Sequence, residues 1–138
     1  MEQKDYILRE IKKIGMILRA IINRLTGSMD GTAIQIEKQF EETKEMLTIE
    51  MDFDLDKFME QNESESKNYL SSFRGINIEN LELLADVLMQ MGFKYKDIQK
   101  QFYLHKSIQL FNYCKQMDKT YIHARESKIY QINKELSK

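Results

Sequence analysis

The sequence predicts an all-α fold, and three observations support this class. Proline is absent from the 138 residues, where average usage predicts roughly seven. Glycine occurs only five times. Sheets with tight turns depend on these two residue types, whereas uninterrupted helices need neither. In addition, apolar residues recur at helical spacing along most of the chain.

The length predicts a single helical domain over residues 1–138, since about 100–200 residues per domain is usual. We expect an amphipathic N-terminal helix (1–27), an acidic helical segment (28–75) and a set of C-terminal helices (76–138). The net charge of −1 conceals this division, because the three segments carry +3, −7 and +3. We expect the complementary segments to meet within one chain or between copies; chance clustering on solvated faces is the alternative.

The first helix is expected from about Lys4 to Thr26, with a turn over Gly27–Gly31. Its apolar residues alternate in spacing between four and three, which is a heptad seam. Because the apolar stripe is broader than one neighbouring helix can cover, we expect it to form an interface between copies. The predicted interface residues are Ile7, Ile11, Ile14, Leu18, Ile21 and Leu25.

The acidic segment is expected to begin its helix at Thr32, which forms a capping-box pattern with Gln35. The stretch Met51–Glu60 fits both the alternation of a strand and the spacing of a helix. Because no second strand is available to pair with it, a helix is favoured. The polar stretch Gln61–Lys67 is predicted to be a flexible connection.

Three more helices are expected after Gly75. Asn77 is a typical N-cap for the first, which Gly92 would end. Asp97 and Asp118 are expected to cap the other two. The buried stripe of the first should consist of Leu81, Leu84, Ala85, Leu88 and Met91. The second helix is expected to carry Ile98, Phe102, Leu104, Ile108, Phe111 and Cys114, and the last to carry Ile122, Ile129, Ile132 and Leu136.

The pattern Leu84-Ala85, Leu88 and Gly92, followed by the run Tyr103–Leu110, resembles a tetratricopeptide-type helical hairpin. In that family a small residue packs the first helix, a glycine turns the chain, and a Tyr-x-x-Lys-Ala-Leu-like stretch forms the second helix. Ser107 departs from the pattern, because the family prefers alanine there, and the usual terminal proline is missing. No second copy follows at a period of about 34 residues, so a repeat array is not expected.

The layout as a whole resembles a group of small uncharacterised bacterial all-helical proteins. The matching parts are Asp5–Arg9, at the start of the amphipathic helix, and Leu81–Leu136, which covers the hairpin and a last helix. This resemblance implies an α-helical fold. It implies no activity and no functional residues.

An acidic run in the middle of the chain is the strongest candidate for a metal site. Its acids match the oxygen-donor positions of a calcium-binding loop; they are Asp52, Asp54, Asp56, Glu60 and Glu63. Lys57 occupies the position where such loops need glycine. We therefore expect a solvated acidic helix face, with cation binding by the run left open.

No signature of catalysis is found. His105, Cys114 and His123 are spaced nine apart, so His105 and Cys114 on one helix would face opposite ways. Zinc-ligand spacing, a phosphate-binding loop and a nucleophile elbow are all missing from the sequence. We expect no catalytic residues, no metal and no cofactor, and hence a protein that is not an enzyme.

Tyr103 and Arg125 are the residues predicted for a ligand or peptide groove. Arg125 lies on the apolar face of the last helix, where its stem can pack while its head pairs with an acid. Anchoring of a ligand is the alternative role for Arg125. Tyr103 belongs to a set of tyrosines that could line a groove, although aromatic residues at helical spacing are more often core.

Charge and cysteine usage narrow the partners and the compartment. A pI near 6.2 and an acidic middle argue against nucleic acid. The single cysteine cannot form an internal disulfide and suits a reducing compartment. We recognise no signal peptide and no apolar run long enough to span a bilayer, so a cytoplasmic location is expected.

The sequence thus predicts a non-enzymatic helical protein–protein interaction module that self-associates, with a dimer favoured and an unidentified protein partner as a further expectation. The alternative is peripheral binding to a membrane surface through the basic amphipathic N-terminal helix. A heptad seam and the lack of Trp and Phe in that helix make a membrane surface the weaker candidate. A third candidate function is that of an enzyme or a small-ligand carrier with a pocket beside Arg125.

Overall fold

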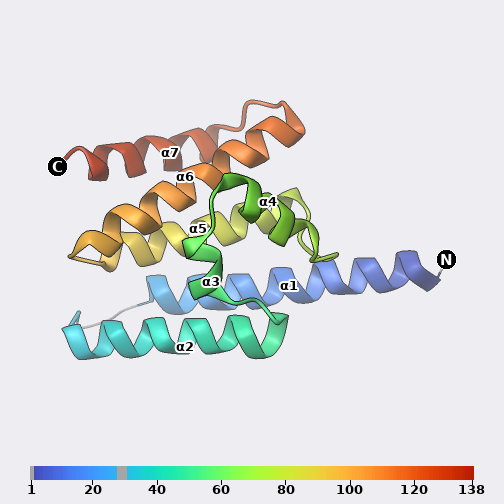
Figure 1. The fold of residues 1–138 in the computed structure, drawn as a ribbon, viewed down its shortest axis with the longest axis horizontal. Helices are drawn as coiled ribbons and strands as arrows, with labels where there is room; N and C mark the ends of the chain where they lie inside the picture. The colour runs from blue at the N-terminus through green and yellow to red at the C-terminus, as the bar shows by residue number, and fades with distance from the viewer. Residues whose placement is uncertain (1, 28–30) are drawn as a thin grey trace.

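A computed structural model describes residues 2–27 and 31–138, and within these ranges the chain forms seven α-helices and no strand (Figure 1). The predicted all-α class is therefore confirmed. The turn predicted over Gly27–Gly31 lies mostly outside the described residues. The helices are α1 (Glu2–Thr26), α2 (Ala33–Met51), α3 (Leu55–Glu60), α4 (Glu63–Ser71), α5 (Ile78–Lys94), α6 (Ile98–Asp118) and α7 (His123–Leu136).

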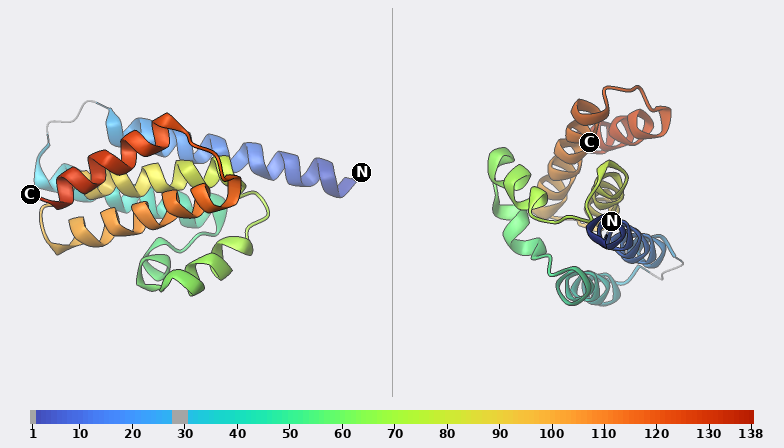
Figure 2. Two further views of the ribbon diagram at one scale, coloured as in Figure 1. Left: turned by 90° about the horizontal axis from the view of Figure 1, so that it is seen from above. Right: turned by 90° about the vertical axis from the view of Figure 1, so that its right-hand side faces the viewer.

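Helix α5 is the centre of the fold. It packs against α1 on one side and forms an antiparallel hairpin with α6 on another, and α7 also contacts it (Figures 1 and 2). Leu84, Ala85 and Val87 are fully buried although they point in three different directions around the helix axis. A helix that is apolar nearly all round is expected at the core of a domain, and α5 occupies that position.

The apolar stripe of α1 belongs to the chain's own core over most of its length. Ile14, Leu18, Ile21 and Leu25 are between 0 and 4% exposed and share one hydrophobic cluster with α5. These four residues were predicted to form an interface between copies, and the structure corrects this. The stripe is indeed too broad for one neighbour, but α2 and α5 of the same chain cover it together.

The first turns of α1 extend beyond the rest of the molecule (Figure 2). The first contacts that fix the helix lie near Ile11, whose carbonyl oxygen accepts a hydrogen bond of 2.9 Å from Asn80 Nδ2. Close by, a side chain at Gly75 would lie 2.8 Å from the Glu10 carbonyl oxygen, so the chain needs glycine to pass here. Residues 2–9, the projecting end, span about 12 Å before this point.

The link between α2 and α3 explains why its sequence fits two patterns. Helix α2 ends at Met51, and Asp52 adopts a left-handed conformation (φ 54°) as its C-cap. Asp54 then begins α3 by accepting a hydrogen bond from the Lys57 backbone at 3.1 Å. Between them Phe53 is fully buried. The strand-like alternation thus belongs to a short non-helical link, and the predicted helix is correct only from Leu55 to Glu60.

The connection predicted to be flexible is largely helical. Asn62 and Glu65 form a reciprocal capping box, and α4 runs from Glu63 to Ser71. The prediction for Gln61–Lys67 was therefore wrong. Its polar composition was taken as a loop signal, whereas the spacing of Asn62 and Glu65 is itself a helix-start signal.

Removing a stripe residue should distinguish an internal core from an exposed face. Leu18→Ala should lower the free energy of unfolding by about 2–5 kcal/mol, because it leaves a cavity at a fully buried site. Met16→Ala, on the same helix but 70% exposed, should change it by less than about 0.5 kcal/mol. Urea unfolding followed by circular dichroism measures both. Equal effects of the two substitutions would contradict the packing described here.

Candidate functional site

In the described part of the chain, an open cleft of about 1010 Å³ lies between α2, α3 and the turn that joins α5 to α6. This volume is at the upper end of the range of about 300–1,000 Å³ found for ligand sites. The first half of α2 forms one wall of the cleft and α3 another. The residue that ends α5, Tyr95, lies between them. The cleft is the main candidate for a binding site.

Three aromatic rings form the floor of the cleft. The ring of Tyr95 lies 4.4 Å from that of Phe40 and 4.9 Å from that of Tyr103, measured between centroids. Phe40 and Tyr103 are buried and Tyr95 is half-buried. Burial raises the pKa of both tyrosines, and the hydrogen bond between their hydroxyl groups raises that of Tyr103 further. The floor is therefore apolar and uncharged at neutral pH.

The walls of the cleft carry charged side chains, several of which are engaged within the protein. Lys44 Nζ lies 3.2 Å from an Asp56 carboxylate oxygen and 3.7 Å from one of Glu41. Burial opposes the charge on Lys44, but the contact with Asp56 outweighs it and raises the lysine pKa. Lys94 donates a hydrogen bond of 2.9 Å to Gln39 Oε1. The carboxylates thus compensate the charge of Lys44, whereas the partner of Lys94 is a neutral amide oxygen.

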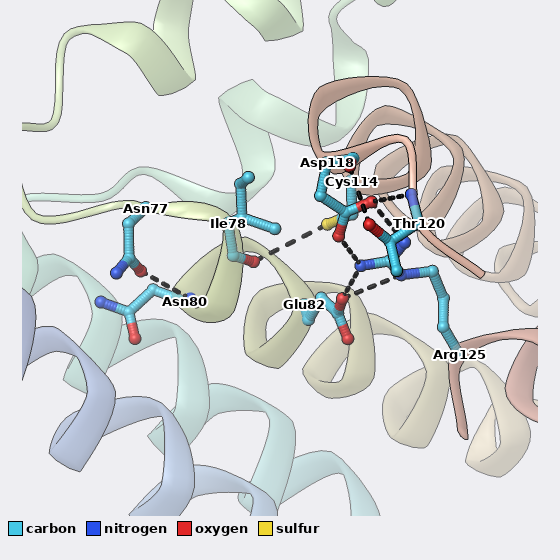
Figure 3. A network of polar contacts seen from close by, with 8 residues as sticks. All are labelled: Asn77, Ile78, Asn80, Glu82, Cys114, Asp118, Thr120 and Arg125. Atoms are coloured by element: carbon cyan, nitrogen blue, oxygen red, sulfur yellow. Dashed lines mark hydrogen bonds and ion pairs between the residues drawn. The ribbon is translucent and has the colours of Figure 1, made fainter. Parts of the chain in front are cut away.

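Arg125 has a structural role at a different place. Its side chain is 1% exposed, and it donates hydrogen bonds to Glu82 of α5 (2.8 Å) and to Asp118 at the end of α6 (3.1 Å) (Figure 3). The predicted pairing of its head with an acid is confirmed. Asp118 was expected to cap the last helix, but it instead binds Arg125 and the Thr120 backbone. Helix α7 begins at His123 without a side-chain cap.

Tyr103 and Arg125 do not share a groove. Tyr103 lines the cleft near the start of α6, whereas Arg125 binds Asp118 at the other end of that helix. The 15 residues between Tyr103 and Asp118 correspond to about 22 Å along the helix axis. The structure thus retains Tyr103 as a residue of a candidate ligand site and removes Arg125 from it.

Two acids of the run in the middle segment are helix caps and two others form ion pairs. Asp52 and Asp54 cap neighbouring helix ends, and Asp56 pairs with Lys44. In the described part of the chain, no group of three or more His, Cys, Asp or Glu side chains is placed to hold a metal ion. His105 and His123 are both exposed on α6 and α7.

Sequence reasoning missed Lys106, which holds one wall of the cleft in place. Its side chain is buried, and its Nζ donates to the Gln61 carbonyl oxygen at 2.8 Å and to the Ser66 hydroxyl. The Nζ also lies 4.7 Å from the centre of the Phe58 ring. Burial lowers the pKa of Lys106. The available signal was its position three residues after Tyr103, on the buried face of α6.

In comparisons with family models, with curated proteins and with solved structures, nothing matches the chain. Helices long and apolar enough to cross a membrane are also missing from residues 2–27 and 31–138.

The contact of Asp118 with Arg125 predicts a pH dependence of stability. Hydrogen bonds from Arg125 lower the pKa of Asp118 below its ordinary value. Ionised Asp118 therefore stabilises the folded protein fully above its ordinary pKa, near 3.9. This stabilisation is lost as the pH falls through the lowered pKa of the folded state. Asp118→Asn should destabilise the protein near neutral pH, and its difference from the wild type should shrink in acid. Urea titrations across this pH range measure the difference in the free energy of unfolding between the two proteins. A difference that does not change with pH would contradict the prediction.

The thiol of Cys114 should be unreactive in the folded protein. Burial, with a further contribution from Glu82, raises its pKa to about 12, whereas a free thiol ionises near 8.5. We expect Ellman's reagent at about pH 8 to react at least on the order of a thousandfold more slowly with folded than with guanidinium-unfolded protein. Rapid labelling of the folded state would show that the thiol is accessible.

Proposed function

We propose that the protein is a non-enzymatic helical interaction module that self-associates as a dimer through the projecting end of α1. The observation that carries this proposal is the exposure of apolar side chains there. Tyr6 is 49% exposed and Leu8 is 50% exposed. Ile7 and Ile11, two of the predicted interface residues, are only partly covered. The heptad seam thus continues beyond the body that buries its later residues.

The apolar side chains of the projecting end lie on one broad arc of the helix, within which Lys4 also falls. Successive residues of a helix are rotated by about 100°, so Tyr6, Ile7 and Leu8 cover an arc of about 200° centred on Ile7. The core-facing residues further along α1 point in the direction of Ile7. A second copy of the same helix end, lying antiparallel, would extend the packing that α2 and α5 provide elsewhere.

A hollow of about 690 Å³ lies beside the projecting end and supplies further surface for a partner. It is lined by Tyr6 and by the end of α2, where Ile49 is 75% exposed. Because the arc and the hollow adjoin on one molecule, a two-fold axis would bring each projecting end to the hollow of the other copy. A standard interface buries about 800 Å² per partner. Because the projecting end is short, the surface of the hollow has to form part of such an interface.

Charge complementarity favours a second copy as the occupant of this surface. Glu50 and Asp52 line the hollow at the C-terminal end of α2, which has no basic residue in its last turn. The helix dipole is negative at the same place. The projecting end and the next turn of α1 carry the exposed Lys4, Arg9 and Lys12, which outnumber Asp5 and Glu10 in the same stretch. Lysine and arginine from one copy can therefore compensate the negative helix end of the other.

The proposal also includes the tetratricopeptide-like character of the α5–α6 hairpin. Its support is close packing at the motif positions. Ser107 Oγ donates a hydrogen bond of 2.7 Å to the Ala85 carbonyl oxygen. A side chain at Gly92 would lie 2.6 Å from Leu104 Cδ2. Gly92 lies inside α5, which continues to Lys94, so the glycine allows close helix packing rather than ending the helix as predicted.

A membrane surface remains the alternative occupant of the projecting end, because basic residues beside apolar ones also suit an interfacial helix. The adjoining hollow, with the exposed Ile49, favours a protein partner. We place the function in the cytoplasm, since the single buried thiol suits a reducing compartment.

Charge introduced at the projecting end should abolish self-association. We expect the wild type to form dimers in the micromolar range, and Tyr6→Glu/Leu8→Glu to weaken the dimer at least 100-fold by burying unpaired carboxylates in the interface. Met16→Glu is the matched control, because Met16 is exposed on the same helix but lies outside the arc. Sedimentation equilibrium measures all three proteins.

Two results would remove the proposal. One is a wild type that stays monomeric at several hundred micromolar. The other is a double variant that dimerises as strongly as Met16→Glu. Cosedimentation with vesicles of phosphatidylserine and phosphatidylcholine completes the test, since binding by a monomeric wild type would favour the membrane alternative.

A further inference from the structure

We infer that the cleft between α2, α3 and the α5–α6 turn binds a basic peptide segment of another protein, with an apolar or aromatic side chain next to lysine or arginine. The cleft lies at the opposite end of the molecule from the projecting end of α1 (Figure 1). The inference therefore goes beyond self-association and does not rest on it.

Exposed apolar side chains at the rim of the cleft provide the first argument. Phe102 lines the cleft and is 55% exposed. Ile98 precedes it by one helical turn on the same face of α6 and is 56% exposed. Below them, Ile36 and Met59 form half-buried walls on opposite sides. An apolar side chain entering the cleft would remove this surface from water.

The aromatic floor provides the second argument. Tyr95 is half-buried, and its ring is held between those of Phe40 and Tyr103. Because neighbouring rings occupy its faces, the part of Tyr95 that remains exposed can meet an aromatic side chain of a ligand edge to face.

The net charge of the cleft favours a positively charged ligand. Five carboxylates and three lysines line it, which leaves two negative charges in excess. Lys44 and Lys94 are engaged within the protein, as described above, and the third lysine, Lys96, is exposed. Glu37 on α2 and Glu60 at the end of α3 are exposed, and neither forms an ion pair with another residue that the structure describes. These two carboxylates are available to a cation from two walls of the cleft.

The arrangement of the acids favours a peptide over a small cation. Glu37, Glu41 and Glu45 follow one another at intervals of four residues, so they form a row along one face of α2. Only the first two line the cleft, and Glu45 continues the row beyond it. A segment with several positive charges can contact the whole row, whereas a single amine cannot. The same acids would repel the phosphates of a nucleic acid.

A tryptophan-labelled peptide is a suitable probe, because the protein contains no tryptophan. We would titrate an acetylated and amidated ten-residue peptide of one Trp, two Leu, four Lys and three Ala with the full chain and follow its fluorescence anisotropy. We expect saturable binding with a dissociation constant in the micromolar range, and an affinity that falls as salt is added. A peptide with glutamate in place of each lysine should not bind.

Variants locate the peptide on the protein. Phe102→Ala and Glu37→Gln/Glu60→Gln should each weaken binding at least fivefold, and because all three residues are exposed, the fold should persist. The matched control is Glu63→Gln/Glu79→Gln, which removes two exposed carboxylates away from both the cleft and the hollow and should bind as the wild type does. Circular dichroism and the Tm confirm that each variant is folded.

Three results would overturn the inference. These are no binding by the wild type at about millimolar protein, equal binding of the glutamate peptide, and full affinity of Phe102→Ala and Glu37→Gln/Glu60→Gln. The Tyr6→Glu/Leu8→Glu protein should bind the peptide normally. If this variant does not bind the peptide, the peptide binds at the projecting end. That result would refute binding in the cleft and leave the proposed dimer untouched.

Discussion

The burial of α5 on nearly all sides is the constraint on which the other features depend. Leu84, Ala85 and Val87 point to different sides of this helix and are all fully buried, which requires both α1 and α6 to pack against it. The length of α5 then decides what lies at each end of the molecule. Because it begins at Ile78, it does not cover the first turns of α1. Because it ends at Lys94, the next residue, Tyr95, forms the floor of the cleft.

Three buried polar residues fasten other parts of the chain to the α5–α6 hairpin. Asn80 binds the α1 backbone, Arg125 joins α7 to Glu82, and Lys106 holds the connection between α3 and α4. Each partner lies more than 40 positions away in the sequence. Burying a polar group without its partner costs free energy. Each of these contacts therefore disfavours arrangements in which the fastened segment packs elsewhere on the hairpin. Apolar packing alone would distinguish these placements less sharply.

The sequence predicted local features better than relations between distant segments. The helix caps at Thr32, Asn77 and Asp97 follow from neighbouring residues, and the structure has all three. The heptad seam correctly predicted a buried face on α1, but an apolar stripe does not reveal whether its partner belongs to the same molecule. Tyr103 was identified as a groove residue from its type and position. The distance that separates it from Arg125 depends on the length of α6 and the return of α7, which no local pattern contains.

The placement of the two surfaces at opposite ends has a consequence for avidity. A dimer joined at the α1 ends would hold its two clefts far apart and facing outward, so one assembly could engage two basic tails at once. Tethering of the second tail would then act as a high effective concentration, which can strengthen overall binding by factors of about 10² to 10⁴ without any new contact. A target that carries paired tails would be retained, whereas one with a single tail would exchange freely.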